Sequence, residues 1–243
     1  MLRTFFIAIF LSLYSIIVGI PLLIFTVISR NPNPLYWAGV KGTVFFVRSV
    51  GVKIVIKGIE RIPSATCLFV ANHTSSADAP AVVGAIPRRI SILLKKSLFK
   101  VPIVGQAFQL ARFIPVDRSQ HDAAVAALEK ATEALRSGQS FLIYPEGTRS
   151  DDGRLQTFKK GAAVMAIKAG VPVVPMACSG AQRVMEKKSL VVHPGTIVVE
   201  FLEPIDASQY TVEQREELNA RMHDAIATGL PPDQRPIGFP GAA

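Results

Sequence analysis

The apolar and polar residues divide the chain into an apolar amino-terminal part and a longer part in which short apolar runs alternate with amphipathic stretches. Residues 4–29 carry no charged side chain, and this run is longer than the roughly 20 residues that cross the apolar core of a bilayer. The competing interpretation is a cleaved signal peptide, but such peptides have a shorter apolar region that ends in a small-residue cleavage site. We therefore expect a retained membrane helix, which Pro21 could kink.

A second helix is expected over residues 35–50, after an Asn-Pro-Asn-Pro break. Its aromatic side chains stand among basic residues, a combination typical of a membrane interface, whereas the alternative is an ordinary amphipathic helix facing a protein core. Basic residues after the apolar run outnumber Arg3 before it: Arg30, Lys41, Arg48, Lys53 and Lys57. The positive-inside rule then places the rest of the chain on the cytoplasmic face of a cell membrane, which in a bacterium is the inner membrane.

Beyond this part, short β-rich runs alternate with helical stretches. The expected strands cover residues 52–57, 67–70, 90–94, 113–116, 141–144, 171–177 and 197–202. Helices are expected after the Ser/Thr cluster 74–76, from a Ser119 cap to Gly138, from about 160 to 169 before Gly170, and from a capping box at 211–214 to about Gly229. This alternation predicts an α/β domain. We divide the chain into membrane-anchoring helices at 1–52, the α/β domain at 53–230 and a mobile Pro/Gly-rich tail at 231–243.

The charge balance indicates which partners the chain suits. It has 27 Lys and Arg against 18 Asp and Glu, a net charge of +9, which suits anionic membrane lipids and phosphorylated substrates. Nucleic acid is not expected, because no basic helix, zinc-ligand spacing or aromatic RNA-binding signature accompanies the charge. Cys67 and Cys178 lie in separate apolar runs, and the four histidines lack ligand spacing. We therefore expect neither a disulfide framework nor a bound metal.

An Asn-His-(four residues)-Asp box, residues 72–78, follows the strand expected at 67–70 and leads into a helix start. Five positions on a continuous helix turn through about 500°, so His73 and Asp78 can meet only if His73 lies in the turn and Asp78 folds back. A carboxylate on one imidazole nitrogen fixes the tautomer and leaves the other nitrogen basic. No Gly-x-Ser-x-Gly elbow occurs, so the nucleophile would be a substrate hydroxyl. The alternative is that His73 only caps the helix and Asp78 satisfies its amides.

Cationic residues follow several other expected strands. In α/β sheets ligands gather at the carboxyl ends of strands, and here Lys95, Arg118 and the turn 146–149 occupy such positions. A guanidinium binds phosphate through two hydrogen bonds and a lysine acts as a point charge, although any one of these cations could be a solvated surface residue. In the stiff turn after Pro145, Glu146 could hold Arg118 or Arg149, or bond a substrate hydroxyl.

With these residues in view, the chain resembles the 1-acylglycerol-3-phosphate acyltransferase family of glycerolipid synthesis, over roughly residues 58–177. Four blocks in the family's order carry the resemblance: 72–78, 112–118 with the preceding 95–102, 144–150, and 171–175. Arg112 departs from the family, which often has glycine there, but the following Asp117-Arg118 pair is intact. The resemblance implies a glycerolipid-acyltransferase-like mixed sheet flanked by helices.

The resemblance also implies roles for the motif residues. His73 is expected to act as general base on the 2-hydroxyl of lysophosphatidic acid, with Asp78 orienting it, so that the hydroxyl attacks an acyl thioester directly. The residues expected to hold the glycerol phosphate are Arg118, Glu146, Gly147, Thr148 and Arg149, and we add Lys95 as a phosphate contact. The amino-terminal helices are expected to seat the enzyme on the membrane. No cofactor is expected, and the donor substrate is acyl-CoA or acyl carrier protein.

Three other functions remain open at this point. The acceptor could be another lyso-lipid, such as lyso-ornithine lipid or a lysophospholipid with a larger head group. The protein could bind membrane lipid without turnover, although the intact His73 and Asp78 argue against this. It could also be a thioester hydrolase in which His73 activates water, since imidazole supplies a base near the working pH.

Overall fold

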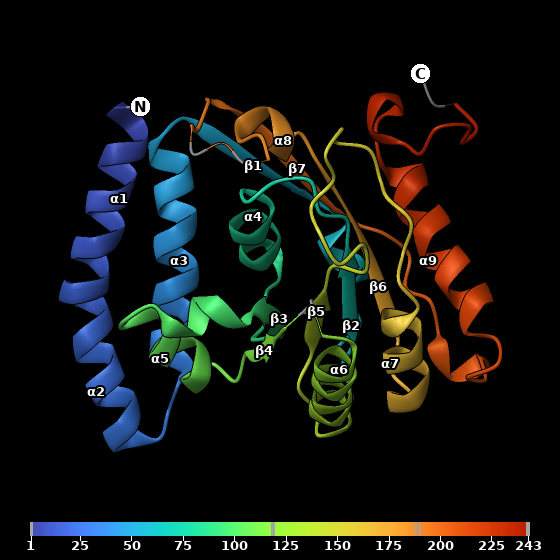
Figure 1. Ribbon diagram of the computed structural model, residues 1–243, viewed down its shortest axis with the longest axis horizontal. Helices are drawn as coiled ribbons and strands as arrows, with labels where there is room; N and C mark the ends of the chain where they lie inside the picture. Colours follow the sequence, from blue (N-terminus) through green and yellow to red (C-terminus); the bar gives the residue numbers. More distant parts are fainter. Residues whose placement is uncertain (1, 118–119, 188, 190, 242–243) are drawn as a thin grey trace.

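A seven-stranded sheet forms the centre of the protein (Figure 1). The structure is a computed structural model, and it describes residues 2–117, 120–187, 189 and 191–241. In chain order the strands are β1 (Val52–Lys57), β2 (Leu68–Ala71), β3 (Ser91–Lys95), β4 (Ile114–Val116), β5 (Phe141–Ile143), β6 (Val173–Ser179) and β7 (Gly195–Phe201). Their order in the sheet is β1-β7-β6-β2-β5-β3-β4, with all neighbours parallel except β6 and β7. The expected α/β fold with a mixed sheet is confirmed.

Helices cover both faces of this sheet. They are α1 (Leu2–Tyr14), α2 (Ile20–Ser29), α3 (Asn33–Ser49), α4 (Asp78–Ala85), α5 (Val104–Leu110), α6 (His121–Arg136), α7 (Gly161–Ala169), α8 (Ala181–Val184) and α9 (Arg215–Gly229), with short turns of other helix types at η1 (Ser15–Gly19), η2 (Ile59–Arg61), η3 (Lys96–Lys100), η4 (Ala207–Gln209) and η5 (Pro232–Gln234). Helices α3, α4 and α8 share a core with Phe69 and Ala71, whereas α6, α7 and α9 share one with Leu68 and Val70. All four residues of β2 are fully buried, because alternate side chains enter opposite, covered faces.

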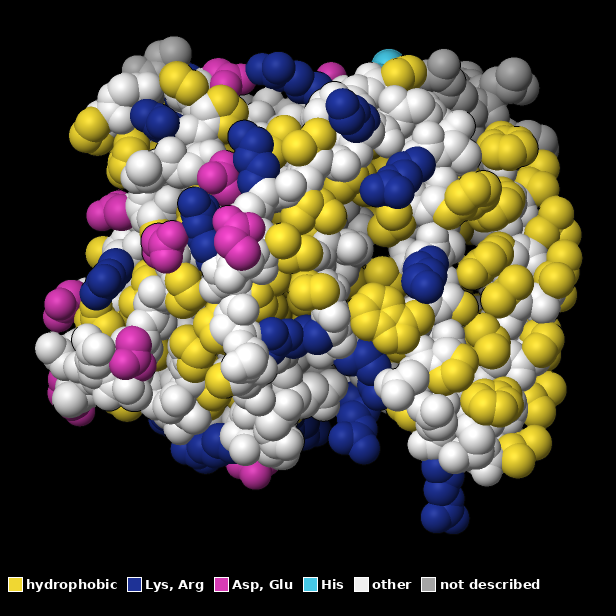
Figure 2. Space-filling view, turned by 180° about the vertical axis from the view of Figure 1, so that it is seen from behind, with side chains coloured by type: hydrophobic (Ala, Val, Ile, Leu, Met, Phe, Trp, Pro, Cys, Tyr) yellow, Lys and Arg dark blue, Asp and Glu magenta, His cyan; other side chains and the backbone are white. Residues whose placement is uncertain are grey.

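The amino-terminal segments α1, η1 and α2 follow one another as one long helix, and α3 returns beside it (Figure 1). The close approach depends on Gly42, where a Cβ atom would lie 2.6 Å from the Tyr14 ring. The exposed apolar side chains of the long helix are Phe6, Ile9, Leu13, Ile16, Ile17, Ile20, Ile24, Phe25, Val27 and Ile28, and they form a band along one side of the molecule (Figure 2). The helix Ile9–Ser29 is long and apolar enough to cross a membrane, and only 6% of its most apolar stretch is buried. This distinguishes it from a core helix and supports membrane association.

Helix α3 packs against both the amino-terminal long helix and the α/β domain. Tyr36 and Phe46 are buried in the core of the domain, as the core-facing interpretation of this helix requires. Phe45 is 61% exposed and its ring lies 6.0 Å from that of Phe10 on α1. The helix therefore fixes the apolar band to the α/β domain.

The carboxyl-terminal tail runs back over the domain. Gln234 is buried, and its carbonyl oxygen accepts a hydrogen bond from the Leu155 nitrogen at 2.9 Å. The Arg235 Nε atom donates to the Leu230 oxygen at 2.9 Å. The mobility expected for residues 231–243 stays a prediction, and these contacts show where the described part of the tail lies.

Candidate active site

The first residue of the turn between β2 and α4, residues 72–77, is held in place by the neighbouring strand β6. Asn72 is fully buried. Its Nδ2 atom donates to the Cys178 oxygen at 2.9 Å, and its Oδ1 atom accepts from the Cys178 nitrogen at 2.7 Å. These two bonds continue the pairing of β2 with β6 beyond Ala71, the last paired residue of β2. The position of the next residue, His73, is therefore set by the sheet.

Asp78 folds back from the first turn of α4 to His73, as the spacing of the two residues requires. The His73 Nδ1 atom lies 3.0 Å from Asp78 Oδ2. The same oxygen accepts hydrogen bonds from the backbone nitrogens of Thr74 at 2.6 Å and Ser75 at 2.8 Å. The Asp78 side chain is fully buried and that of His73 is 15% exposed. One carboxylate therefore satisfies the turn amides and also binds the imidazole.

This geometry makes the other imidazole nitrogen the basic one. When Asp78 accepts from Nδ1–H, neutral His73 has its lone pair on Nε2. A buried carboxylate at Nδ1 also stabilises the imidazolium that forms when Nε2 takes a proton. The nearby Cys178 thiol is no candidate nucleophile, since burial and the charge of Asp78 raise its pKa well above the usual value. The site can therefore activate a hydroxyl group that a substrate brings.

The loop after β5 holds His73 from a second side. The ring of Tyr144 stacks on the imidazole with 4.2 Å between the ring centres. The Glu146 Oε1 atom accepts a hydrogen bond from the His73 nitrogen at 3.3 Å, and the Ser150 nitrogen donates to the His73 oxygen at 2.8 Å. The ring, the amide and the carbonyl of His73 are thus each contacted by one short loop.

Glu146 lies beneath the turn with only 5% of its surface exposed. Its second oxygen, Oε2, is buried and has no hydrogen-bond partner among the described residues. The pKa of Glu146 is raised to about 8, mainly by burial and also by the charge of Asp78, while the bond from the His73 amide opposes the shift. The carboxyl group is therefore mostly protonated at neutral pH. No sequence signal indicated that this side chain points inward, toward the backbone of His73.

Arg149 lies beside the turn that carries His73. Its Nη1 atom donates to Ser76 Oγ at 2.6 Å, so the structure pairs this guanidinium with Ser76 while Glu146 bonds to His73. Thr148 is exposed, and Gly147 has φ 76°, a left-handed conformation that glycine adopts without strain. Within the turn 147–149, Thr148 is therefore the exposed side chain, and it stands beside Arg149.

Lys187 supports Arg149 and was not anticipated from the sequence. Its Nζ atom donates to the Arg149 oxygen at 2.6 Å and lies 2.8 Å from a carboxylate oxygen of Asp151. The side chain is only 18% exposed. A single lysine outside any motif gives no signal in one sequence, because only the fold brings it to the 149–151 segment.

The register of the parallel strands places the remaining candidates. Val70 pairs with Ile143, and β3 and β4 continue this row with Leu93 and Ile114. Three residues further along the chain, past the carboxyl ends of the four strands, come His73, Glu146, Lys96 and Asp117. Exposed Lys95 lies two strands from β2, roughly 10 Å away at about 4.8 Å per strand. Arg118 falls outside the described residues.

A metal site is not indicated by these contacts. Among the residues that the structure describes, no three His, Cys, Asp or Glu side chains come together in a way that could hold a metal ion. Cys67 and Cys178 are both buried and free. The chemistry of the described site therefore rests on the imidazole and its neighbours.

Comparison with known proteins places this site in a family. The family model described as Acyltransferase matches residues 53–179. The 1-acyl-sn-glycerol-3-phosphate acyltransferase of Limnanthes douglasii is 33% identical over 205 residues, which cover 84% of this chain and 72% of that protein. The enzyme of the same name from Pseudomonas aeruginosa is 35% identical over 150 residues, 61% of this chain and 58% of that one. The crystal structure of the 1-acyl-sn-glycerophosphate (LPA) acyltransferase PlsC from Thermotoga maritima matches with a TM-score of 0.81 at 28% identity, covering 94% of this chain and 93% of that chain.

The raised pKa of Glu146 predicts how stability depends on pH. Between the ordinary value of 4.5 and the folded value of about 8, the unfolded chain releases a proton that the folded protein keeps. The free energy of unfolding of the wild type therefore falls as the pH rises through this window, by about 1.4 kcal/mol per pH unit. Glu146→Gln removes this dependence, so the free energy of unfolding of the variant should rise relative to that of the wild type as the pH rises. Denaturant titrations in detergent at pH values of about 5, 6.5 and 8 measure the difference, and two parallel curves would contradict the assignment.

Proposed function

Because the chain belongs to the acyltransferase family that includes the 1-acyl-sn-glycerol-3-phosphate acyltransferases, we propose that it acylates the 2-hydroxyl of 1-acyl-sn-glycerol-3-phosphate. An acyl thioester is the donor, and phosphatidic acid for phospholipid biosynthesis is the product. The observation that carries this proposal is the His73–Asp78 pair, in which Nδ1 and Oδ2 are 3.0 Å apart. The similarity to the acyltransferases named above supports the same proposal. Acyl-CoA and acyl carrier protein are the two donors considered, and neither needs a cofactor.

In the proposed reaction His73 Nε2 takes the proton of the acceptor's 2-hydroxyl as its oxygen attacks the thioester carbonyl. The new C–O bond forms, the C–S bond breaks, and the departing sulfur takes the proton from the imidazolium. Asp78 stabilises the charge on the ring between these two transfers. A thioester is already activated, so no covalent intermediate on the protein is required.

The cations at the sheet edge are proposed to hold the acceptor phosphate. Arg149 lies beside Ser76 in the turn that carries His73, and Gly147 and Thr148 offer backbone and hydroxyl groups next to it. Lys95, with Arg118 from outside the described residues, would add positive charge across the edge. For Glu146 its burial and its bond to the His73 amide favour a positioning role over direct contact with the glycerol.

The amino-terminal part gives the protein its place in the cell. The exposed apolar band of residues 6–28 supports association with a membrane. We propose that residues 1–52 anchor the acyltransferase domain, residues 53–230, on the cytoplasmic face of a cell membrane, the inner membrane in a bacterium. The surplus of basic residues would then meet anionic lipids.

The reaction is tested by following thiol release from palmitoyl-CoA by the detergent-solubilised enzyme, with and without lysophosphatidic acid, and identifying the lipid by mass spectrometry. We expect release that depends on the acceptor and yields phosphatidic acid. His73→Ala is expected to reduce it at least about a hundredfold, whereas the exposed control His193→Ala is expected to keep it. Thiol release without acceptor would instead indicate a hydrolase. A clear preference for lyso-ornithine lipid would mean that this lipid, and not lysophosphatidic acid, is the acceptor. Lipid binding without release from either donor would identify a binding protein.

Arg149→Ala is expected to raise the KM for lysophosphatidic acid by about ten- to a hundredfold, because a charge-assisted pair with phosphate is lost. The KM for palmitoyl-CoA should change little. Steady-state kinetics with each substrate varied in turn separates the two values. Arg221→Ala, which removes an exposed guanidinium from α9, is the matched control. An effect confined to the donor would move Arg149 to the other substrate.

A further inference from the structure

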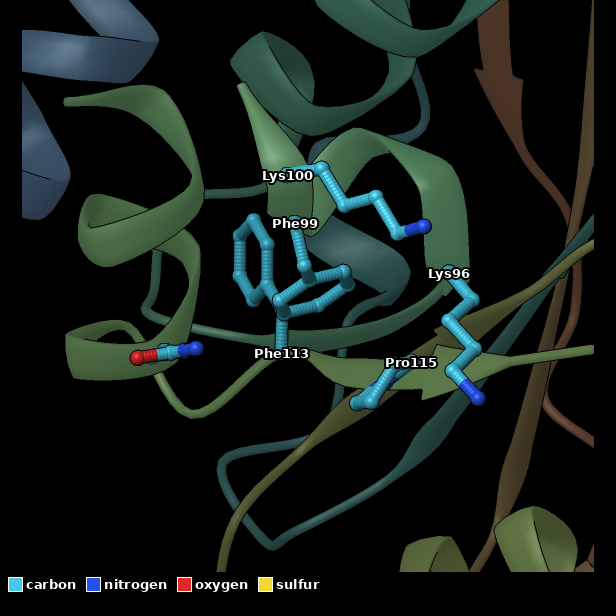
Figure 3. Close-up of a pocket in the computed structure, with 6 residues that line it drawn as sticks. Lys96, Phe99, Lys100, Phe113 and Pro115 are labelled. Carbon is cyan, nitrogen blue, oxygen red and sulfur yellow. The ribbon is translucent and has the colours of Figure 1, made fainter. Parts of the chain in front are cut away.

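A hollow opens beside β4, the strand at one end of the sheet (Figure 3). Its volume is about 390 Å³, and it lies between η3, α5 and β4. The residues that line it are Lys96, Phe99, Lys100, Gln109, Phe113 and Pro115. Figure 3 shows Phe99, Phe113 and Pro115 at the hollow together with the two lysine side chains, and the rings of Phe99 and Phe113 each lie against that of Phe108, with ring centres 5.8 and 5.5 Å apart. The hollow therefore combines an aromatic surface with two positively charged side chains.

The hollow lies on the same side of the sheet edge as His73. Strands β2, β5, β3 and β4 are parallel neighbours, and Lys96 follows the carboxyl end of β3 as His73 follows that of β2. Two to three strand spacings of about 4.8 Å separate them, which is roughly 10 to 14 Å. A ligand in the hollow would therefore lie next to Lys95, the residue before Lys96 and a proposed contact of the acceptor phosphate.

The lining suits a nucleotide with several phosphate groups. Lys96 and Lys100 are exposed, and no ion pair among the described residues involves either of them. Lysine binds phosphate as a point charge, and bases stack readily on aromatic side chains. The acidic surface of a partner protein could also bind the two lysines. A concave site of this size with two phenyl rings, however, fits a small molecule better than a protein surface.

The length of one donor matches the distance from the hollow to His73. In an acyl-CoA about 13 bonds join the thioester sulfur to the nearer phosphorus, which at 3.3–3.6 Å for every three bonds of an extended chain is roughly 15 Å. A donor with its sulfur at His73 would then place its phosphates at the lysines. The pantetheine part of acyl-CoA is therefore just long enough to span the distance between His73 and the two lysines.

We propose that this hollow binds the 3′-phosphorylated adenosine diphosphate end of acyl-CoA, with the adenine on the phenyl rings and the phosphates at Lys96 and Lys100. The assignment rests on the proposed function, because it names the donor of that reaction. It makes acyl-CoA a donor that the protein recognises by its nucleotide.

Binding of adenosine 3′,5′-bisphosphate to the full-length protein in detergent tests the hollow without turnover. Isothermal titration is expected to show that the double variant Lys96→Glu, Lys100→Glu weakens binding at least tenfold. The control Lys130→Glu, Lys168→Glu makes the same charge change at exposed positions of α6 and α7 and should bind like the wild type. Phe113→Leu is expected to weaken binding at least about fivefold. Equal affinities for the lysine variant and its control, or no binding by the wild type, would overturn the proposal.

Kinetics then connects the hollow to the donor. The lysine variant is expected to raise the KM for palmitoyl-CoA at least tenfold over its control, and this ratio should fall below about two with S-palmitoyl-pantetheine, which lacks the nucleotide. A KM rise shared by palmitoyl-pantetheine, or one seen only with palmitoyl-acyl carrier protein, would overturn the assignment. If acyl transfer itself is absent, the titration still decides whether the hollow binds the nucleotide.

Discussion

One buried carboxylate organises the site. Asp78 is fully buried and accepts from Thr74, Ser75 and His73 through a single oxygen. A buried anion is costly unless hydrogen bonds replace its water, and here these bonds also shape the turn. The interaction that starts α4 is therefore the one that orients the imidazole. The stability of the turn and the proposed role of His73 as a base depend on the same group.

The rest of the site depends on the three central strands ending at one edge. Strand β6 fixes Asn72 through the backbone of Cys178, β2 delivers His73, and the loop after β5 contacts the imidazole from the other side. Parallel strands make this possible, because their carboxyl ends meet at one edge. The loop that supplies Arg149 also holds the backbone of His73 through Glu146 and Ser150. A displacement of Arg149, the proposed acceptor contact, would therefore also displace the backbone of His73.

Much of this arrangement could be predicted from the sequence, because it depends on local pattern. All seven β-rich runs became strands, and the spacing of His73 and Asp78 sufficed to predict how they meet. The environment of Glu146 could not be predicted, since the same turn chemistry permits an ion pair with Arg149 or a bond to His73. Lys187 was missed because it reaches the 149–151 segment only through tertiary structure. Helices α5 and α8 were missed because short helices carry little periodicity.

Asp78→Asn is the most direct test of the central role of this carboxylate. The amide oxygen can still accept from the turn nitrogens, whereas a neutral group no longer holds the tautomer or stabilises the imidazolium. With acceptor-dependent thiol release as the readout, kcat is expected to fall about 10³- to 10⁴-fold while circular dichroism and the unfolding transition show a folded protein. A folded Asp78→Asn variant with a kcat within about tenfold of the wild type would contradict the account.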